Sequence, residues 1–211
     1  MGKIKQGILG GFNGKVGTVV GFSWKGKSVM RGRAQSIKKS NTAAQVAQRE
    51  KFTLVSNFIQ LIKDVIDVGF KKQARGMSAS NAAFSYHIKN AVSGDAINPA
   101  NVLISRGSLP NVEDIVSYID NYSVVTSWTN NGGTGGALDD DEALVLIYNP
   151  SKGETISSVL EITRDEESIS INFPESWEGD SPYSYLGFMS ADGKRIATSS
   201  CQVVAANAPG N

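Results

Sequence analysis

The stretch from Phe52 to Val68 carries apolar residues in two adjacent stripes at helical spacing. One stripe follows spacings of 3, 4, 3 and 4, and the other runs beside it; their members are Phe52, Val55, Ile59, Ile62 and Ile66, and Leu54, Phe58, Leu61, Val65 and Val68. An apolar arc this wide must be covered on two sides. We therefore expect one helix from about Asn41 to Lys72 that is either covered on both sides within one subunit or shared between subunits, with Phe52, Phe58 and Ile62 as the candidates for packing in an oligomer.

The charges of the chain are sorted along its length. The first 40 residues contain nine Lys and Arg and no Asp or Glu, whereas residues 101–211 contain sixteen Asp and Glu against five Lys and Arg. The formal net charge of +1 therefore hides two opposite poles. A chain of this kind should bind an anionic partner with its first part, or the acidic part of a second copy.

The first part is rich in glycine and predicts short strands joined by tight turns. Asn13-Gly14 favours a type I′ hairpin turn, Val16 to Trp24 would be the return strand, and Lys25-Gly26-Lys27 would form the next turn. The cations of this part are the candidate contacts to nucleic acid or to another subunit: Lys3, Lys5, Lys15, Lys25, Lys27, Arg31, Arg33, Lys38 and Lys39. Phe12, Phe22 and Trp24 offer stacking faces beside them.

A second helix is predicted from about Ala82 to Val92. Ser78 or Ser80 would be its N-cap and Gly94 the residue that follows its end. Lys71, Lys72 and Arg75 precede it and extend the basic part of the chain. The single histidine of the chain, His87, is expected to be an ordinary core or surface residue of this helix.

From Asn101 onward the pattern changes to short alternating runs separated by turn signals. Ser168 to Phe173 alternates, with Ile169, Ile171 and Phe173 inward, and Ala143 to Tyr148 has the continuous apolar character of a central strand. Asp192-Gly193 favours a hairpin turn. We expect residues 102–204 to fold alone as an antiparallel sandwich with Trp128 in its core and the acidic loop from Asp139 to Glu142 exposed.

The fold class predicted is therefore α+β, with a Gly-rich β-hairpin start, a two-helix middle and a C-terminal antiparallel β-sandwich. The domains would be residues 1–100, a basic hairpin plus helical assembly domain, and residues 101–211, an acidic sandwich. The order of parts in residues 102–204 is similar to a fibronectin type III or immunoglobulin-like module, with Leu109-Pro110 at the entry and Tyr122 to Trp128 as a strand. That resemblance implies adhesion, spacing or decoration.

Motifs of catalytic or cofactor sites do not match. Gly10 to Lys15 lacks the spacing of a phosphate-binding loop, because Leu9 stands five residues before Gly14 and Val16 follows Lys15. Asp139, Asp141 and Glu142 lack the spacing of a calcium-binding loop, and the single cysteine, Cys201, lies in a strand-like run. We predict no enzyme activity, no cofactor and no metal site.

The start of the chain lacks the apolar run of a secretory signal, and no stretch is long and apolar enough to span a membrane. We expect a location in the cytoplasm or in a virion assembled there, without membrane contact.

Three stretches together carry a resemblance that covers nearly the whole chain: GILGGFNGKVGTVVGFSWKGK, KKSNTAAQVAQREKFTLVSNFIQ, and GFKKQARGMSASNAAFSYHIKNAV with NVLISRGSLP. They resemble a Bacteroidota family known only as a domain of unknown function. The resemblance implies a bacterial or bacteriophage origin and brings no site residues with it.

Two functional hypotheses of different classes remain, with a third behind them. The first is a structural, self-assembling protein, such as a capsid or decoration subunit of a bacteriophage, whose partners are copies of itself and other virion proteins. The second is a nucleic-acid-binding protein that uses the basic N-terminal region. The third is an adhesive or carbohydrate-binding module in the β-rich part.

Overall fold

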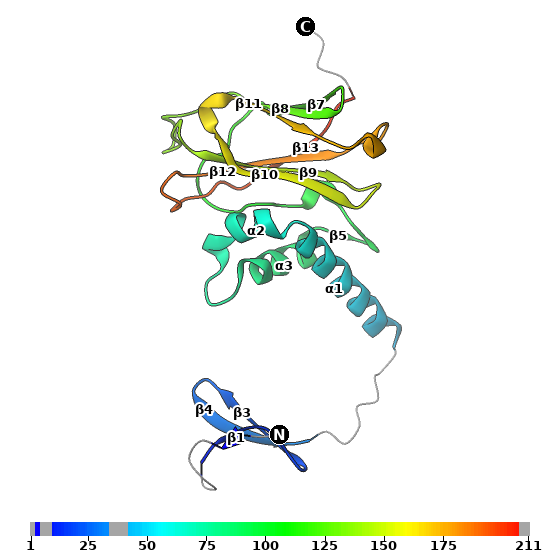
Figure 1. Cartoon of the computed structure of the whole chain (residues 1–211), viewed down its shortest axis with the longest axis vertical. Helices are drawn as coiled ribbons and strands as arrows, with labels where there is room; N and C mark the ends of the chain where they lie inside the picture. Colours follow the sequence, from blue (N-terminus) through cyan, green and yellow to red (C-terminus); the bar gives the residue numbers. More distant parts are fainter. Residues whose placement is uncertain (1–2, 5–9, 34–41, 207–211) are drawn as a thin grey trace. The chain divides into compact units, whose positions relative to one another are not determined.

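A computed structural model describes residues 3–4, 10–33 and 42–206, and the chain divides into two compact units, Met1–Gln45 and Val46–Asn211. Figure 1 draws both units. The sequence placed the boundary near residue 100. The division falls earlier because the helices and the β-sheets of the second unit share a core, as shown below.

The first unit is an antiparallel sheet in the order β1-β2-β3-β4, formed by Lys3–Ile4, Phe12–Val16, Val19–Trp24 and Lys27–Gly32. The turn predicted at Lys25-Gly26 is confirmed, and both residues have the positive φ angles, 50° and 77°, of a type I′ turn. The turn predicted at Asn13-Gly14 is wrong. Both residues lie within β2, and the chain reverses at Gly17, where Val16 pairs with Val19.

Cross-strand packing gives a glycine of this sheet a role. Gly14 pairs with Gly21 of β3. The ring of Phe12 lies against Gly21 so closely that a Cβ atom there would come within 2.7 Å of the ring. Gly21 therefore leaves the room that the aromatic ring needs on this side of the sheet.

The predicted long helix is two helices, α1 (Ala43–Leu61) and α2 (Lys63–Gly69), which meet at Ile62. Backbone hydrogen bonds from Ile62 to Phe58 and from Ile66 to Ile62 continue across the junction. A short 3-10 helix, η2 (Lys71–Gln73), follows α2. The second predicted helix is α3 (Ala79–Asn90), and Ser78 is its N-cap because its Oγ accepts a hydrogen bond of 3.2 Å from the backbone N–H of Asn81.

The rest of the second unit consists of a hairpin and two antiparallel sheets, so the fold class α+β is confirmed. The hairpin pairs β5 (Val92–Ser93) with β6 (Ala96–Ile97), and η3 (Pro99–Asn101) follows it. Gly94, predicted to follow the second helix, lies in the turn of this hairpin with a φ of 61°.

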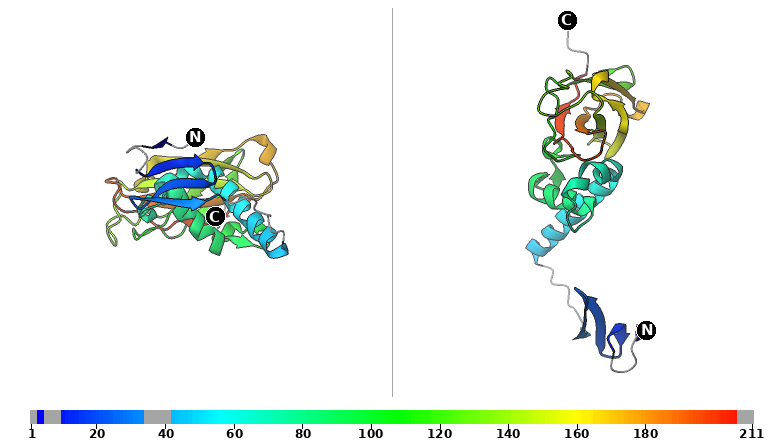
Figure 2. Two further views of the ribbon diagram at one scale, coloured as in Figure 1. Left: turned by 90° about the horizontal axis from the view of Figure 1, so that it is seen from below. Right: turned by 90° about the vertical axis from the view of Figure 1, so that its left-hand side faces the viewer.

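The larger sheet has the order β10-β9-β12-β13, formed by Glu154–Thr163, Glu142–Asn149, Tyr183–Met189 and Ser200–Val203. The smaller sheet has the order β11-β8-β7, formed by Ser168–Asn172, Ser123–Ser127 and Val116–Asp120. Two further 3-10 helices, η4 (Arg164–Glu166) and η5 (Glu175–Trp177), connect these strands. In Figures 1 and 2 the larger sheet lies between the helices and the smaller sheet.

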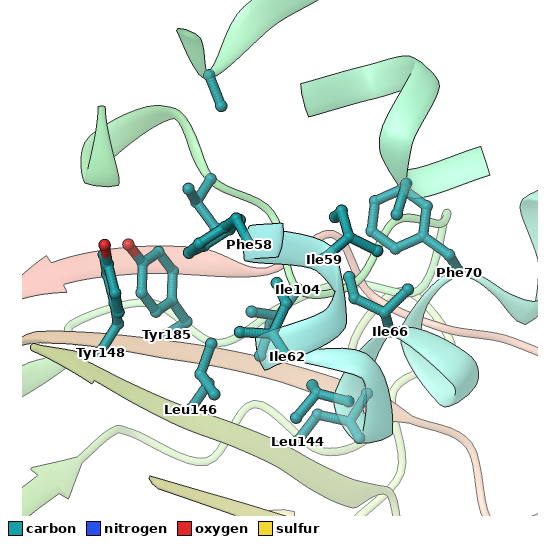
Figure 3. Close-up of a cluster of buried hydrophobic side chains, with 14 of the residues drawn as sticks. Phe58, Ile59, Ile62, Ile66, Phe70, Ile104, Leu144, Leu146, Tyr148 and Tyr185 are labelled. Carbon is teal, nitrogen blue, oxygen red and sulfur yellow. The ribbon is translucent and has the colours of Figure 1, made fainter. Parts of the chain in front are cut away.

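Strand β9 is buried on both faces, as its continuous apolar run predicts. Leu144, Leu146 and Tyr148 belong to a core shared with the helices, and Ala143, Val145 and Ile147 to a core between the two sheets. Figure 3 shows the first core, in which Phe58, Ile62 and Ile66 meet Leu144, Leu146 and Tyr185. The second core contains Trp128, as expected.

Of the three residues expected to pack between subunits, two are buried within the chain and one is exposed. Phe58 and Ile62 are 5% and 2% exposed and lie in the chain's own core, so for these two residues the cover comes from within the subunit, the first of the two alternatives. Phe52 is 55% exposed, and its ring centroid lies 4.6 Å from that of Phe84 on α3.

His87 is fully buried on α3 and bonded on both ring nitrogens. Its Nε2 accepts a hydrogen bond of 3.3 Å from the backbone N–H of Leu103, so its Nδ1 carries the proton and donates to the carbonyl of Ala83 at 2.7 Å. Burial lowers the pKa of His87 below its usual value. The Nε2 bond holds α3 to the chain that follows η3, while the Nδ1 bond lies within α3, so both nitrogens have a structural role.

The acidic loop is exposed only in part. Asp139 and Asp140 are exposed, but Asp141 is fully buried, which corrects the expectation for this residue. The Asp141 carboxylate pairs with Arg164, whose Nη2 lies 3.0 Å from Asp141 Oδ2. In the described ranges no group of His, Cys, Asp and Glu side chains could hold a metal ion, and no helix is long and apolar enough to cross a membrane.

Candidate functional site

The register of the N-terminal sheet gathers basic and aromatic side chains on one face. Residues directly opposite one another in paired strands point to the same side. Val20 pairs with Lys15 and Arg31, Phe22 with Val29, and Trp24 with Lys27. We call this set the basic–aromatic face: Lys15, Val20, Phe22, Trp24, Lys27, Val29 and Arg31.

Two cations lie over the aromatic rings of this sheet. The Arg31 guanidinium is 5.9 Å from the ring centroid of Phe22, and the Lys25 ammonium is 5.2 Å from that of Trp24. Contacts of this kind are worth about 0.5–1 kcal/mol at exposed sites. Trp24 remains 60% exposed, so its ring is available to a partner.

No carboxylate close in sequence offsets these charges, because the first 40 residues contain no Asp or Glu. Among the ion pairs formed within the described ranges, none involves a cation of the N-terminal sheet. The basic–aromatic face therefore presents uncompensated positive charge beside exposed aromatic surface.

The structure places five of the nine predicted contact cations. Lys15, Lys27 and Arg31 share the basic–aromatic face, Lys25 lies in the turn beside it, and Arg33 follows β4; all five are exposed. Lys3 lies in β1, but its side chain is outside the description. The remaining three predicted cations lie outside the described residues: Lys5, Lys38 and Lys39.

The opposite face of the sheet is apolar and also exposed. Met30 is 70% exposed and Val16 is 51% exposed, while Phe12 and Val19 are half-buried. A small sheet that leaves its apolar side chains exposed on both faces is marginally stable unless it is covered. This surface is suited to contact with a partner.

A cluster of carboxylates lies at one end of the second unit. The backbone N–H of Asp165 donates to the carbonyl of Asp139 at 3.2 Å, which holds the η4 segment beside the loop before β9. We call the exposed carboxylates of these two segments the acidic end: Asp139, Asp140, Asp165, Glu166 and Glu167. In the part of the chain that the structure describes, none of the five forms an ion pair with Lys or Arg.

Arg164 is a residue that the sequence analysis missed. It lies within the acidic run at the end of β10, yet its guanidinium is fully buried and binds Asp141. Within the described ranges its ion pair is with Asp141, and it forms none with the exposed carboxylates around it. Only the folded chain reveals this, because an arginine in an acidic run is usually an exposed partner of its neighbours.

A family model described as "Family of unknown function (DUF6266)" matches residues 11–202. None of the curated proteins matches.

Two solved structures show weak similarity. One is a DUF3823 family protein from Bacteroides ovatus, with 15% identity, a TM-score of 0.30 and coverage of 46% of this chain and 55% of that chain. The other is the adhesin domain of Epf from Streptococcus pyogenes, with 14% identity, a TM-score of 0.32 and coverage of 48% of this chain and 33% of that chain. The chain thus spans about half of the length of the first protein and about a third of the length of the second.

Proposed function

The chain belongs to DUF6266, a family of unknown function, and we propose that it is a structural protein that assembles with copies of itself. In this assembly the basic–aromatic face of one copy binds the acidic end of another. The observation that carries the proposal is the presence, on one chain, of two exposed surfaces of opposite charge whose ions have no partners among the described ion pairs.

The two parts of the contact have different roles. Opposite charges bring the surfaces together and orient them, but exposed ion pairs contribute only about 0–1 kcal/mol each. Burial of Trp24, Phe22 and Val29 would supply most of the binding free energy, at roughly 25 cal/mol per Å² of apolar surface removed from water. Because the two surfaces differ, the contact is heterologous and repeats into a ring or a filament.

We extend the proposal to the biological setting of the assembly and to the fold type of the β-rich part. A capsid or decoration layer of a bacteriophage is an assembly in which one small chain repeats one contact many times, and it would place the protein in a virion or in the cytoplasm before assembly. The seven strands β7 to β13 would form an immunoglobulin-like sandwich. Support for the finer fold comes from two antiparallel sheets that share a core containing Trp128.

A second candidate function uses the same face. Exposed aromatic rings beside cations on an antiparallel sheet suit single-stranded nucleic acid, whose bases stack while its phosphates are neutralised. Trp24 and Phe22 beside Lys27 and Arg31 provide this combination. Binding would then weaken steeply with added salt.

A charge-exchange experiment tests the assembly. One variant reverses the face with Lys15→Glu, Lys27→Glu and Arg31→Glu, and the other reverses the acidic end with Asp140→Lys, Asp165→Lys and Glu166→Lys. We expect the parent to form oligomers in 50 mM salt that dissociate in 1 M salt, where the Debye length is about 3 Å. Each variant alone should be monomeric, and an equimolar mixture should assemble because both contacts are then restored.

The control reverses three carboxylates outside the acidic end, with Asp120→Lys, Glu175→Lys and Glu178→Lys, and should assemble like the parent. Molar mass from light scattering after size-exclusion chromatography measures all five samples. A parent that is monomeric in both salt concentrations would overturn the assembly. If that monomer binds a fluorescent single-stranded oligonucleotide and the face-reversed variant does not, the second candidate function replaces the first.

A further inference from the structure

A strongly basic cleft lies in the second unit, and no residue of the acidic end lines it. Its volume is about 720 Å³, which is within the range of small-molecule sites. Five of its lining residues are cations and none is Asp or Glu: Lys72, Arg75, Arg106, Lys194 and Arg195. They come from three separate segments, namely η2 and the residues after it, the connection from η3 to β7, and the connection from β12 to β13.

The wall that carries Arg106 is held by several contacts. The backbone N–H of Arg106 donates to the carbonyl of Gly69 at 3.1 Å, and its guanidinium lies 5.5 Å from the ring centroid of Tyr86. Gly107 exchanges two hydrogen bonds with Thr198: its N–H donates to Thr198 Oγ1 at 3.2 Å, and that hydroxyl donates to its carbonyl at 3.0 Å. Arg106 is therefore positioned before any ligand binds.

Most of the positive charge in the cleft is not neutralised. Lys194 pairs with the exposed Asp192 at 3.1 Å, and Arg195 Nη2 donates to the carbonyl of Gly136 at 2.6 Å. Within the described ranges, Lys72, Arg75 and Arg106 form no ion pair. A bond to a neutral carbonyl leaves the charge of Arg195 in place, so four of the five positive charges line this concave surface without a counter-charge among the described ion pairs.

We propose that this cleft binds the linked phosphate groups of a small polyphosphate, either free or as the triphosphate of a nucleotide. Three arginines favour phosphate because the guanidinium fork makes paired hydrogen bonds to its oxygens. Linked phosphates concentrate several charges in a small volume, whereas the carboxylates on one side of an extended acidic peptide are spaced by about two residues, or 6–7 Å. The lining contains no aromatic residue, so recognition rests on the phosphates.

The test measures binding of tripolyphosphate and of ATP to the full-length protein by isothermal titration calorimetry in 150 mM salt. We expect saturable binding of both to the parent. Arg75→Gln with Arg106→Gln should weaken binding at least about tenfold, which corresponds to about 1.4 kcal/mol. Lys72→Gln with Arg75→Gln, which leaves the Arg106 contact to Tyr86 intact, should also weaken it, so a folding defect at Arg106 cannot decide the result.

One control locates the site. Lys89→Gln with Lys152→Gln removes two exposed cations elsewhere and should leave binding unchanged. Equal affinity for tripolyphosphate and ATP would assign the free polyphosphate, and tighter binding of ATP the nucleotide.

The proposal is overturned if the parent shows no saturable binding, or if the cleft variants bind like the parent. It is also overturned if they lose self-assembly instead of phosphate binding, which would make the cleft a contact between copies. Because oligomeric state is measured separately, failure of this proposal and failure of the proposed assembly are distinguishable.

Discussion

At the scale of single residues, Arg164 ties four segments of the second unit together. Its Nε and Nη2 donate to Asp141 Oδ2 at 3.2 and 3.0 Å, its Nη1 donates to Asn131 Oδ1 at 2.6 Å, and its Nη2 donates to the carbonyl of Pro110 at 3.2 Å. The guanidinium also lies 4.2 Å from the ring centroid of Phe188. The buried charge is thus paired and hydrogen-bonded, as a buried ion must be.

We predict that Arg164→Met lowers the free energy of unfolding by about 3–5 kcal/mol, because it leaves the Asp141 carboxylate buried without its counter-charge. The double variant Arg164→Met with Asp141→Leu should lose clearly less, since it removes both charges. Urea unfolding followed by tryptophan fluorescence measures both. Lys152→Met, a change at an exposed residue, is the control; a double variant as unstable as the single one would contradict this account.

At the scale of elements, α1 has two apolar sides with different surroundings. Phe58 faces the larger sheet, where its ring centroid lies 5.3 Å from that of Tyr148. Phe52, six residues earlier, is more than half exposed. The apolar pattern treats these two phenylalanines alike, and only the position of the sheet separates them.

Truncation of the two phenylalanines should therefore have unequal effects. Phe58→Ala opens a cavity in a closed core and is expected to lower the free energy of unfolding by about 3–5 kcal/mol. Phe52→Ala, the matched control, removes mainly its contact with Phe84 and should lower it by about 1 kcal/mol. Chemical denaturation of both variants checks this, and equal losses would mean that α1 does not pack on the sheet through Phe58.

At the scale of the molecule, the second unit has two cores that share one sheet. The face of β9 and β12 that carries Leu144, Leu146, Tyr148 and Tyr185 is covered by the helices. The other face packs against the smaller sheet. The β-rich part is therefore joined to the helices by a continuous apolar layer.

Two fragments test this layering and replace the expectation that residues 102–204 fold alone. We predict that residues 42–211 unfold cooperatively without the N-terminal sheet. Residues 102–204 should aggregate or bind an apolar dye, because they expose the face of β9 and β12 that the helices cover. Circular dichroism, thermal unfolding and dye fluorescence measure this; a fragment 102–204 that melts cooperatively and binds no dye would refute it.

The sequence alone determined the features that depend on near neighbours. Ser78 caps α3 because its side chain needs only the backbone of Asn81, and Lys25-Gly26 turns because the conformation is set by those two residues. The alternation that puts Ile169 and Ile171 on the inner side of β11 is likewise local. For the candidate site, the charge segregation predicted the basic N-terminal surface, of which the described sheet places five cations.

Only the tertiary structure decided the features that depend on residues far apart in the chain. Asp141 is buried because Arg164, 23 residues later, neutralises it. Gly14 lies in a strand, paired with Gly21 of β3, and Phe58 is internal because Tyr148 of β9 covers it. The basic cleft forms where three separate segments meet, so no window of sequence contains it. Local patterns determine where a helix begins, where the chain turns and how side chains alternate along a strand. Burial and the pairing of charges depend on which distant surfaces come into contact.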